Sequence, residues 1–182
     1  MNEHMEIEQN IGVNKWRVIG WSAVMIILLA PLVAMQVTDE VEWTLSDFVV
    51  AGVMLGGSGL LLELAARKSG NVAYRGGVVV AVLAALLLSW INGAVGIIGN
   101  EDNPLNLMFA VVPLVAISGS IITRFKADGL ARTMVAAAIV QAIVAFIALI
   151  AGHFTLLISA FFVGLWLISA RFFGRAHSAP AE

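Results

Sequence analysis

Six long apolar segments alternate with short polar segments along the chain. Each is close to the ~20 residues that an α-helix needs to cross the ~30 Å hydrocarbon core of a bilayer. The pattern therefore predicts an all-α, polytopic membrane protein whose six-helix bundle covers residues 18–170, between tails of residues 1–17 and 171–182. The third segment is long enough to tilt or to unwind at its end. The predicted spans are Val18–Val37, Phe48–Ala66, Gly77–Gly99, Leu105–Thr123, Thr133–Ala151 and Phe154–Ala170.

The composition excludes most water-soluble classes of protein. Hydrophobic residues make up 60% of the 182 residues and charged residues 12%, against roughly 45–50% and roughly 25% in soluble domains. A soluble protein of this size could not bury so much apolar surface. A water-soluble enzyme, a nucleic-acid-binding protein and a disordered chain are therefore excluded, and the expected partner is the lipid bilayer. The sequence has no cysteine, which excludes disulfides and thiolate metal sites.

The basic residues indicate the orientation of the chain. All ten Lys and Arg residues fall on one side of the predicted spans, whereas the first two loops on the other side carry only acidic charges. By the positive-inside rule, both termini are expected to be cytoplasmic. A five-span or seven-span arrangement would break this alternation. The basic residues are Lys15, Arg17, Arg67, Lys68, Arg75, Arg124, Lys126, Arg132, Arg171 and Arg175.

The first outer loop contains a helix-start signal. Thr44 is followed by Asp47 at capping-box spacing, and Trp43 and Phe48 are placed to form the accompanying hydrophobic staple. Asp47 is therefore expected to accept backbone N–H groups at the start of the second span, where the helix dipole favours a carboxylate. This structural role is favoured over metal binding.

The second outer loop, Gly99-Asn100-Glu101-Asp102-Asn103-Pro104, contains the main candidate binding residues. Glu101 and Asp102 could join other outer carboxylates in an oxygen-rich cation site. Asn92 lies just before this loop, at membrane depth. Asn103 suits a helix N-cap and is a further candidate. The alternative is a solvated acidic rim that follows from the topology alone.

Two polar residues inside the predicted spans are also candidate binding residues. Glu63 is the one acidic side chain within a span, and intramembrane acids are functional candidates by default. Arg67 lies four residues later on the same helix face, so an ion pair would explain Glu63 without a function; both interpretations stay open. Gln141 can bond a neighbouring helix or line a polar pathway, if other polar groups at depth face it. Those groups are Ser89, Asn92, Ser118 and Ser120.

Small residues at helical spacing allow helices to approach closely. Gly52 and Gly56 form G-x-x-x-G in the second span, and Ala30 and Ala34 form a similar pair in the first. Such faces pack helices within one chain or between chains. They predict a homo-oligomer or a membrane-protein partner, as an alternative to packing inside the bundle.

The stretch from Trp90 to Met108 resembles a family of small, uncharacterised bacterial six-helix inner-membrane proteins that carry the motif A-V-G-I-I-G-x-E-D-N-P-x-N-L-M. The segments from Asp47 to Ala66 and from Ala73 to Arg75 are similar to the same family, so the resemblance covers most of spans two to four. It implies a bacterial origin and a plasma-membrane location, but no activity, because none is established for that family. It directs attention to Gly96, Gly99, Glu101, Asp102, Asn103, Pro104 and Asn106.

The sequence leaves two functions open. The first is the handling of a small solute or ion through an outward-facing acidic vestibule above Asn92. The alternative is a non-transporting accessory or assembly subunit whose small-residue faces pack against another membrane protein. An intramembrane enzyme is least favoured, because no nucleophile–base pair or metal cluster lies at one depth, and no cofactor is expected. A transporter requires the polar groups at depth to converge on a cavity, whereas a subunit requires a solid core.

Overall fold

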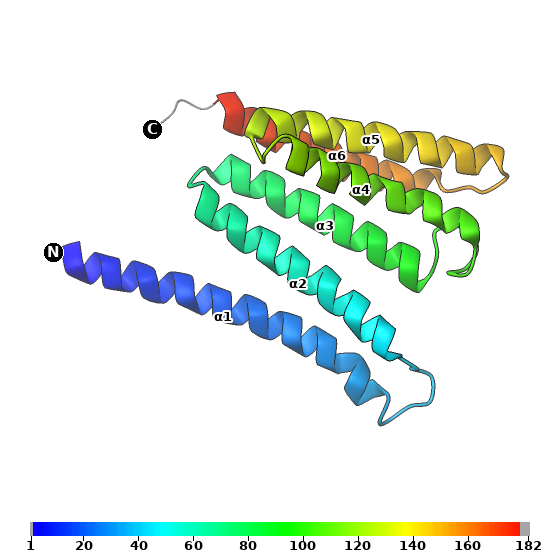
Figure 1. The fold of residues 1–182 in the computed structure, drawn as a ribbon, viewed down its shortest axis with the longest axis horizontal. Helices are drawn as coiled ribbons and strands as arrows, with labels where there is room; N and C mark the ends of the chain where they lie inside the picture. The colour runs from blue at the N-terminus through cyan, green and yellow to red at the C-terminus, as the bar shows by residue number, and fades with distance from the viewer. Residues whose placement is uncertain (1, 179–182) are drawn as a thin grey trace. The chain divides into compact units, whose positions relative to one another are not determined.

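The computed structural model describes residues 2–178, with the backbone alone for residues 2–14 and Trp16. Within this range the chain forms six α-helices, one short 3-10 helix and no β-strand (Figure 1). The all-α prediction is therefore confirmed. The helices are α1 (Asn2–Ala34), α2 (Leu45–Lys68), α3 (Val72–Ala94), η1 (Pro104–Asn106), α4 (Leu107–Ile122), α5 (Ala127–Ile150) and α6 (Leu156–Ser178).

All six of these α-helices contain a segment long and apolar enough to cross a membrane. The prediction of six spans is confirmed, although the helix boundaries differ from the predicted ones. α3 begins at Val72 rather than Gly77, because the Asn71 side chain caps it by accepting the Tyr74 N–H at 3.0 Å. It ends at Ala94, so the last residues of the predicted third span have left the helix.

α1 and α6 continue into the regions predicted as tails. α1 begins at Asn2 and α6 ends at Ser178. A membrane helix can extend beyond the hydrocarbon core, so these helices are longer than the spans within them. The most apolar part of α1 runs from Arg17 to Ala34.

The chain divides into two compact units, one ending at Glu63 and the other beginning at Leu64. The first unit contains α1 and most of α2. No residue of the α1 span is buried, so this unit has no core around α1.

The start of α2 shows the predicted cap. The Asp47 carboxylate accepts the Thr44 N–H at 2.7 Å and the Thr44 hydroxyl at 2.8 Å. Trp43 packs edge-on against Phe48, with ring centroids 5.1 Å apart. The capping interaction and the hydrophobic staple are therefore confirmed, and together they fix the residue at which α2 begins.

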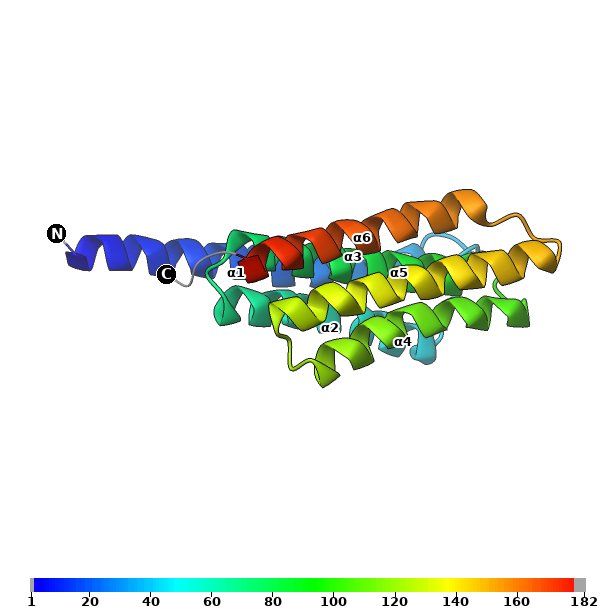
Figure 2. The same cartoon turned by 90° about the horizontal axis from the view of Figure 1, so that it is seen from above.

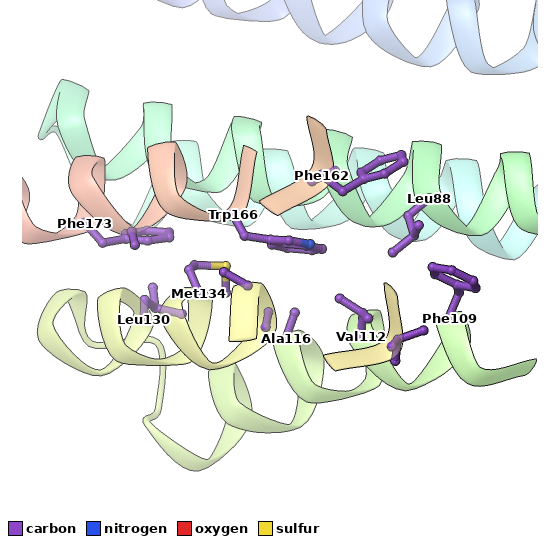
Figure 3. Close-up of a cluster of buried hydrophobic side chains, with 14 of the residues drawn as sticks. Leu88, Phe109, Val112, Ala116, Leu130, Met134, Phe162, Trp166 and Phe173 are labelled. Carbon is purple, nitrogen blue, oxygen red and sulfur yellow. The ribbon is translucent and has the colours of Figure 1, made fainter. Parts of the chain in front are cut away.

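The second unit is a bundle of α3, α4, α5 and α6. α5 packs against α4 and α6, and α3 packs against the same two helices, so the four helices close a ring (Figure 2). Side chains fill its centre, where Trp166 and Phe162 of α6 lie opposite side chains of α4 and α5 (Figure 3). These two rings and those of Phe109 and Phe173 are at most 1% exposed. The centre of this bundle is therefore a packed apolar core.

α4 and α5 approach closely through two glycine–threonine pairs. A Cβ on Gly119 of α4 would lie 2.5 Å from the Thr133 methyl group of α5. A Cβ on Gly129 of α5 would overlap the Cβ of Thr123, at the end of α4. Both threonine hydroxyls bond carbonyls of their own helix, Thr123 to Gly119 at 2.8 Å and Thr133 to Gly129 at 3.0 Å. Each glycine thus makes room for the threonine of the opposite helix.

The α2–α3 and α4–α5 loops lie at the same end of the second unit. Arg124 and Phe125 have φ angles of 52° and 57°, in the left-handed region that non-glycine residues rarely adopt. Lys68 donates to both of their carbonyls, at 3.2 and 3.1 Å, and the Tyr74 hydroxyl donates to Phe125 at 3.0 Å. Arg75 donates to two nearby backbone carbonyls at 2.6 and 2.7 Å. Basic residues of both loops are therefore gathered at one end of the bundle.

We expect Gly129→Ala and Gly119→Ala each to lower the free energy of unfolding by about 1–3 kcal/mol, because the added methyl group overfills the α4–α5 contact. Gly164→Ala in α6 is the matched control, since its Cβ would meet no atom within 4 Å. That change should be neutral or stabilise the helix by up to about 1 kcal/mol. Unfolding of the purified protein in mixed detergent micelles measures all three. Equal effects at the three glycines would contradict the packing described.

Candidate functional site

The most highly structured loop of the second unit joins α3 to α4 and is built around Asn106. This side chain is 4% exposed. Its amide oxygen accepts the N–H groups of Ile97 and Ile98 at 3.0 and 2.8 Å, and its amide nitrogen donates to the carbonyls of Ile98 and Asn100 at 3.3 and 2.6 Å. One asparagine thus satisfies backbone groups that are exposed when α3 ends.

Two glycines of this loop adopt conformations that other residues rarely take. Gly96 has φ of 78° and Gly99 has φ of 69°. A Cβ on Gly96 would also overlap the Asn100 carbonyl and lie 2.8 Å from the Asn106 amide nitrogen. Glycine at position 96 is therefore required by both the backbone conformation and the lack of space.

The predicted binding residues of this loop fall into two groups. Asn92 donates to the Asn106 carbonyl at 3.0 Å, and Asn103 accepts the Leu105 N–H at 3.0 Å. Asn103 therefore acts as the N-cap of η1, as its position before Pro104 predicted. Glu101 and Asp102 are exposed. The loop is a fixed backbone frame that displays two carboxylates, while the two asparagines hold the frame together.

Glu63 forms its described contacts within the first unit. Its carboxylate lies 2.6 Å from an Arg17 nitrogen and accepts the Trp21 indole N–H at 3.2 Å. Its side chain is 15% exposed, against 44% for Arg17. These contacts join α1 to α2. They support a structural role for Glu63, with ion-pair and hydrogen-bond partners on α1. The predicted pair with Arg67 stays a prediction.

Gln141 is completely buried on α5. Its amide nitrogen lies 3.5 Å from the Ser159 hydroxyl of α6, at the limit of a hydrogen bond. Its amide oxygen and the Trp166 indole nitrogen have no hydrogen-bond partner among the described residues. Gln141 therefore links α5 to α6, which is the role that buried amides usually have between membrane helices.

The serines of α4 bond to their own helix. Ser118 donates to the Leu114 carbonyl at 2.7 Å, and Ser120 donates to the Ala116 carbonyl at 2.6 Å. Asn92 is bonded to the α3–α4 loop and Gln141 to α6. In the described bonds, these polar groups do not join into one pathway along the bundle.

The described residues contain no group of three or more His, Cys, Asp or Glu side chains that could hold a metal ion. No family model, no curated protein and no solved structure matches the chain.

The residue pattern alone does not identify three contributors to these sites. Local spacing does not predict the contact of Arg17 and Trp21 with Glu63, because 42 positions separate Trp21 from Glu63. Asn106 was singled out only by the family resemblance. An Asn two residues after an Asn-Pro pair, near a glycine-rich helix end, is the local signal that could have identified it.

We expect Asn106→Ala to destabilise the protein by about 2–4 kcal/mol, because it leaves several buried backbone groups without partners. Hydrogen exchange should become faster at the Ile97 and Ile98 amides in particular. Glu101→Gln in the same loop is the control and should change stability by less than about 0.5 kcal/mol, since its side chain is exposed. Unchanged exchange at these two amides in Asn106→Ala would contradict the role given to Asn106.

Proposed function

We propose that this multi-pass protein resides in a bacterial plasma membrane with both ends cytoplasmic. Six apolar helices support a membrane location. The clustering of Lys68, Arg75 and Arg124 at one end of the second unit supports the orientation, because the positive-inside rule assigns such an end to the cytoplasm. The family resemblance in spans two to four supports the bacterial inner membrane.

The orientation can be tested by single cysteines, since the chain has none of its own. Asp102→Cys lies in the exposed α3–α4 loop, and Gly70→Cys lies in the exposed α2–α3 loop at the basic end. In intact bacterial cells, a membrane-impermeant maleimide should label Asp102→Cys and should label Gly70→Cys only after permeabilisation. The reverse pattern would contradict the proposed orientation.

Within that membrane, we infer that the protein is a non-transporting subunit of an assembly. The observation that carries this inference is the packed centre of the four-helix unit, where aromatic rings fill the space that a solute path would need. Among the polar groups at depth, Asn92 bonds the α3–α4 loop and Gln141 bonds α6, whereas the two serines of α4 bond their own helix. A packed core is what an assembly subunit requires.

The contact surface for this assembly is the glycine face of α2, defined as Gly52 and Gly56. A Cβ at either position would meet no atom within 4 Å. By contrast, a Cβ on Gly59, further along α2, would lie 3.6 Å from the Trp21 ring. The G-x-x-x-G pattern permits two helices to approach with their backbones close together. A second copy of α2 is the occupant that such a face fits, because each copy supplies the same small residues.

The alternative function is the handling of a small solute or ion through the acidic outer loop. Its support is the frame held by Asn106, which displays Glu101 and Asp102 in the exposed α3–α4 loop. It is less favoured because Asn92 and Gln141 make hydrogen bonds within the fold rather than lining a common cavity.

We expect the double variant Gly52→Ile/Gly56→Ile to raise the dissociation constant of a dimer by roughly 5- to 150-fold, because bulky side chains prevent close backbone approach at a cost of about 1–3 kcal/mol. Gly164→Ile in α6 is the control, since that position is equally open but lies outside the motif. Dilution of fluorescently labelled protein in liposomes, followed by energy transfer, measures the constant. A parent protein that stays monomeric at all lipid ratios would overturn self-association through α2.

A further inference from the structure

Two buried polar atoms on facing helices of the second unit have no hydrogen-bond partner among the described residues. They are the amide oxygen of Gln141 on α5 and the indole nitrogen of Trp166 on α6. Both side chains are 0% exposed. The Gln141 amide nitrogen is directed to the Ser159 hydroxyl, 3.5 Å away. The amide oxygen can only accept a hydrogen bond and the indole N–H can only donate one, so the two atoms are complementary.

An unpaired polar atom inside a membrane protein opposes folding. It loses its bonds to water on burial and gains none in return, and the hydrocarbon around the bundle offers no partner. Buried donors and acceptors are therefore nearly always bonded, either to protein groups or to ordered water. An acceptor on α5 and a donor on α6, both without a partner in the described residues, indicate that one small molecule bonds to both.

The directions of the two side chains bring these atoms toward each other. α5 and α6 are antiparallel neighbours (Figure 2), and Gln141 lies beside Ser159. Trp166 is seven residues, or two turns, after Ser159, so it lies on the same face of α6 about 10 Å further along the axis. Side chains of a helix lean toward its N-terminus, so Gln141 and Trp166 lean toward each other. Figure 3 shows the indole nitrogen at the end of the Trp166 ring nearer Phe162.

α5 contributes only methyl groups at the level between these two atoms. Ala137 and Ala138 lie one turn before Gln141, and they are 0% and 4% exposed. Met134, a larger core side chain of α5, lies a further turn away. The smallest buried side chains of α5 are therefore placed where Gln141 and Trp166 approach each other.

We propose that one water molecule is bound between α5 and α6, where it accepts the Trp166 indole N–H and donates to the Gln141 amide oxygen. The Ser159 hydroxyl, next to the Gln141 amide, is the third neighbour, and about three hydrogen bonds are typical of a buried water. Because water both donates and accepts, it fits the Gln141 amide in either orientation. The bound water links α5 to α6 inside the apolar core. This inference does not depend on the assembly proposed for α2.

The test is nuclear magnetic resonance of the full ¹⁵N-labelled chain in detergent micelles. The Trp166 indole N–H should show a cross-relaxation peak to water, with the sign of a bound water rather than of proton exchange, although the side chain is 0% exposed. Trp166→Phe identifies the resonance by removing it. Absence of the peak in the parent protein would overturn the proposal, because a direct bond or an unpaired indole gives no contact with water.

Three variants separate a bound water from other sources of this peak. Gln141→Met removes the acceptor at similar volume, so the peak should lose most of its intensity. Ser159→Ala should keep the peak, because Gln141 and Trp166 remain. Ser169→Ala is the matched control, since it removes a buried hydroxyl of α6 that donates to the Gly77 carbonyl. Loss in Ser159→Ala with retention in Gln141→Met would assign the peak to the serine hydroxyl and overturn the proposal, as would equal loss in Ser169→Ala and Gln141→Met.

Unfolding in mixed detergent micelles gives an independent measurement. Gln141→Met and Trp166→Phe each leave one end of the water bridge unpaired, whereas the double variant removes both ends. The folding equilibrium constant of the double variant should therefore exceed the value expected from the two single effects at least about fivefold. Purely additive effects would contradict a bridge between the two side chains.

Discussion

In a bilayer, every backbone N–H and C=O group that leaves a helix needs a partner inside the protein. This requirement explains the sites where the structure is most elaborate. Asn106 supplies partners where α3 ends, and Lys68 and Tyr74 supply donors for the carbonyls of the tight α4–α5 turn. Within a helix the backbone N–H and C=O groups bond to one another, so side-chain partners for the backbone are needed mainly at the helix ends.

The two units differ in how much of their side-chain surface is buried. The four-helix unit buries its aromatic residues and brings α4 and α5 close through glycine–threonine pairs. In the unit of α1 and most of α2, the described polar contact between the two helices is centred on Glu63, and a Cβ at Gly52 or Gly56 would meet no atom within 4 Å. A protein that combines a packed bundle with an unburied helix is suited to having other helices complete it, and the proposed assembly rests on this contrast.

Much of the fold could be predicted because membrane helices have a strong local signal. Length and hydropathy located the six helices, and local spacing identified the cap at Asp47 and the N-cap at Asn103. The pairing of Glu63 with Arg17 could not be found in this way, because it depends on which faces of α1 and α2 meet. The bond between Gln141 and Ser159 depends likewise on the register of α5 against α6. Helix periodicity identifies the apolar and polar faces of each helix. It does not determine how far one helix is shifted along its neighbour.

The glycine–threonine pairs between α4 and α5 have a consequence for sequence divergence. Gly119 faces Thr133, and Gly129 faces Thr123, so each pair shares one fixed volume. A larger side chain on one helix is tolerated only when its counterpart shrinks, for example to serine or alanine. These four positions form two coupled pairs, and in diverging descendants of this chain they will change together rather than singly.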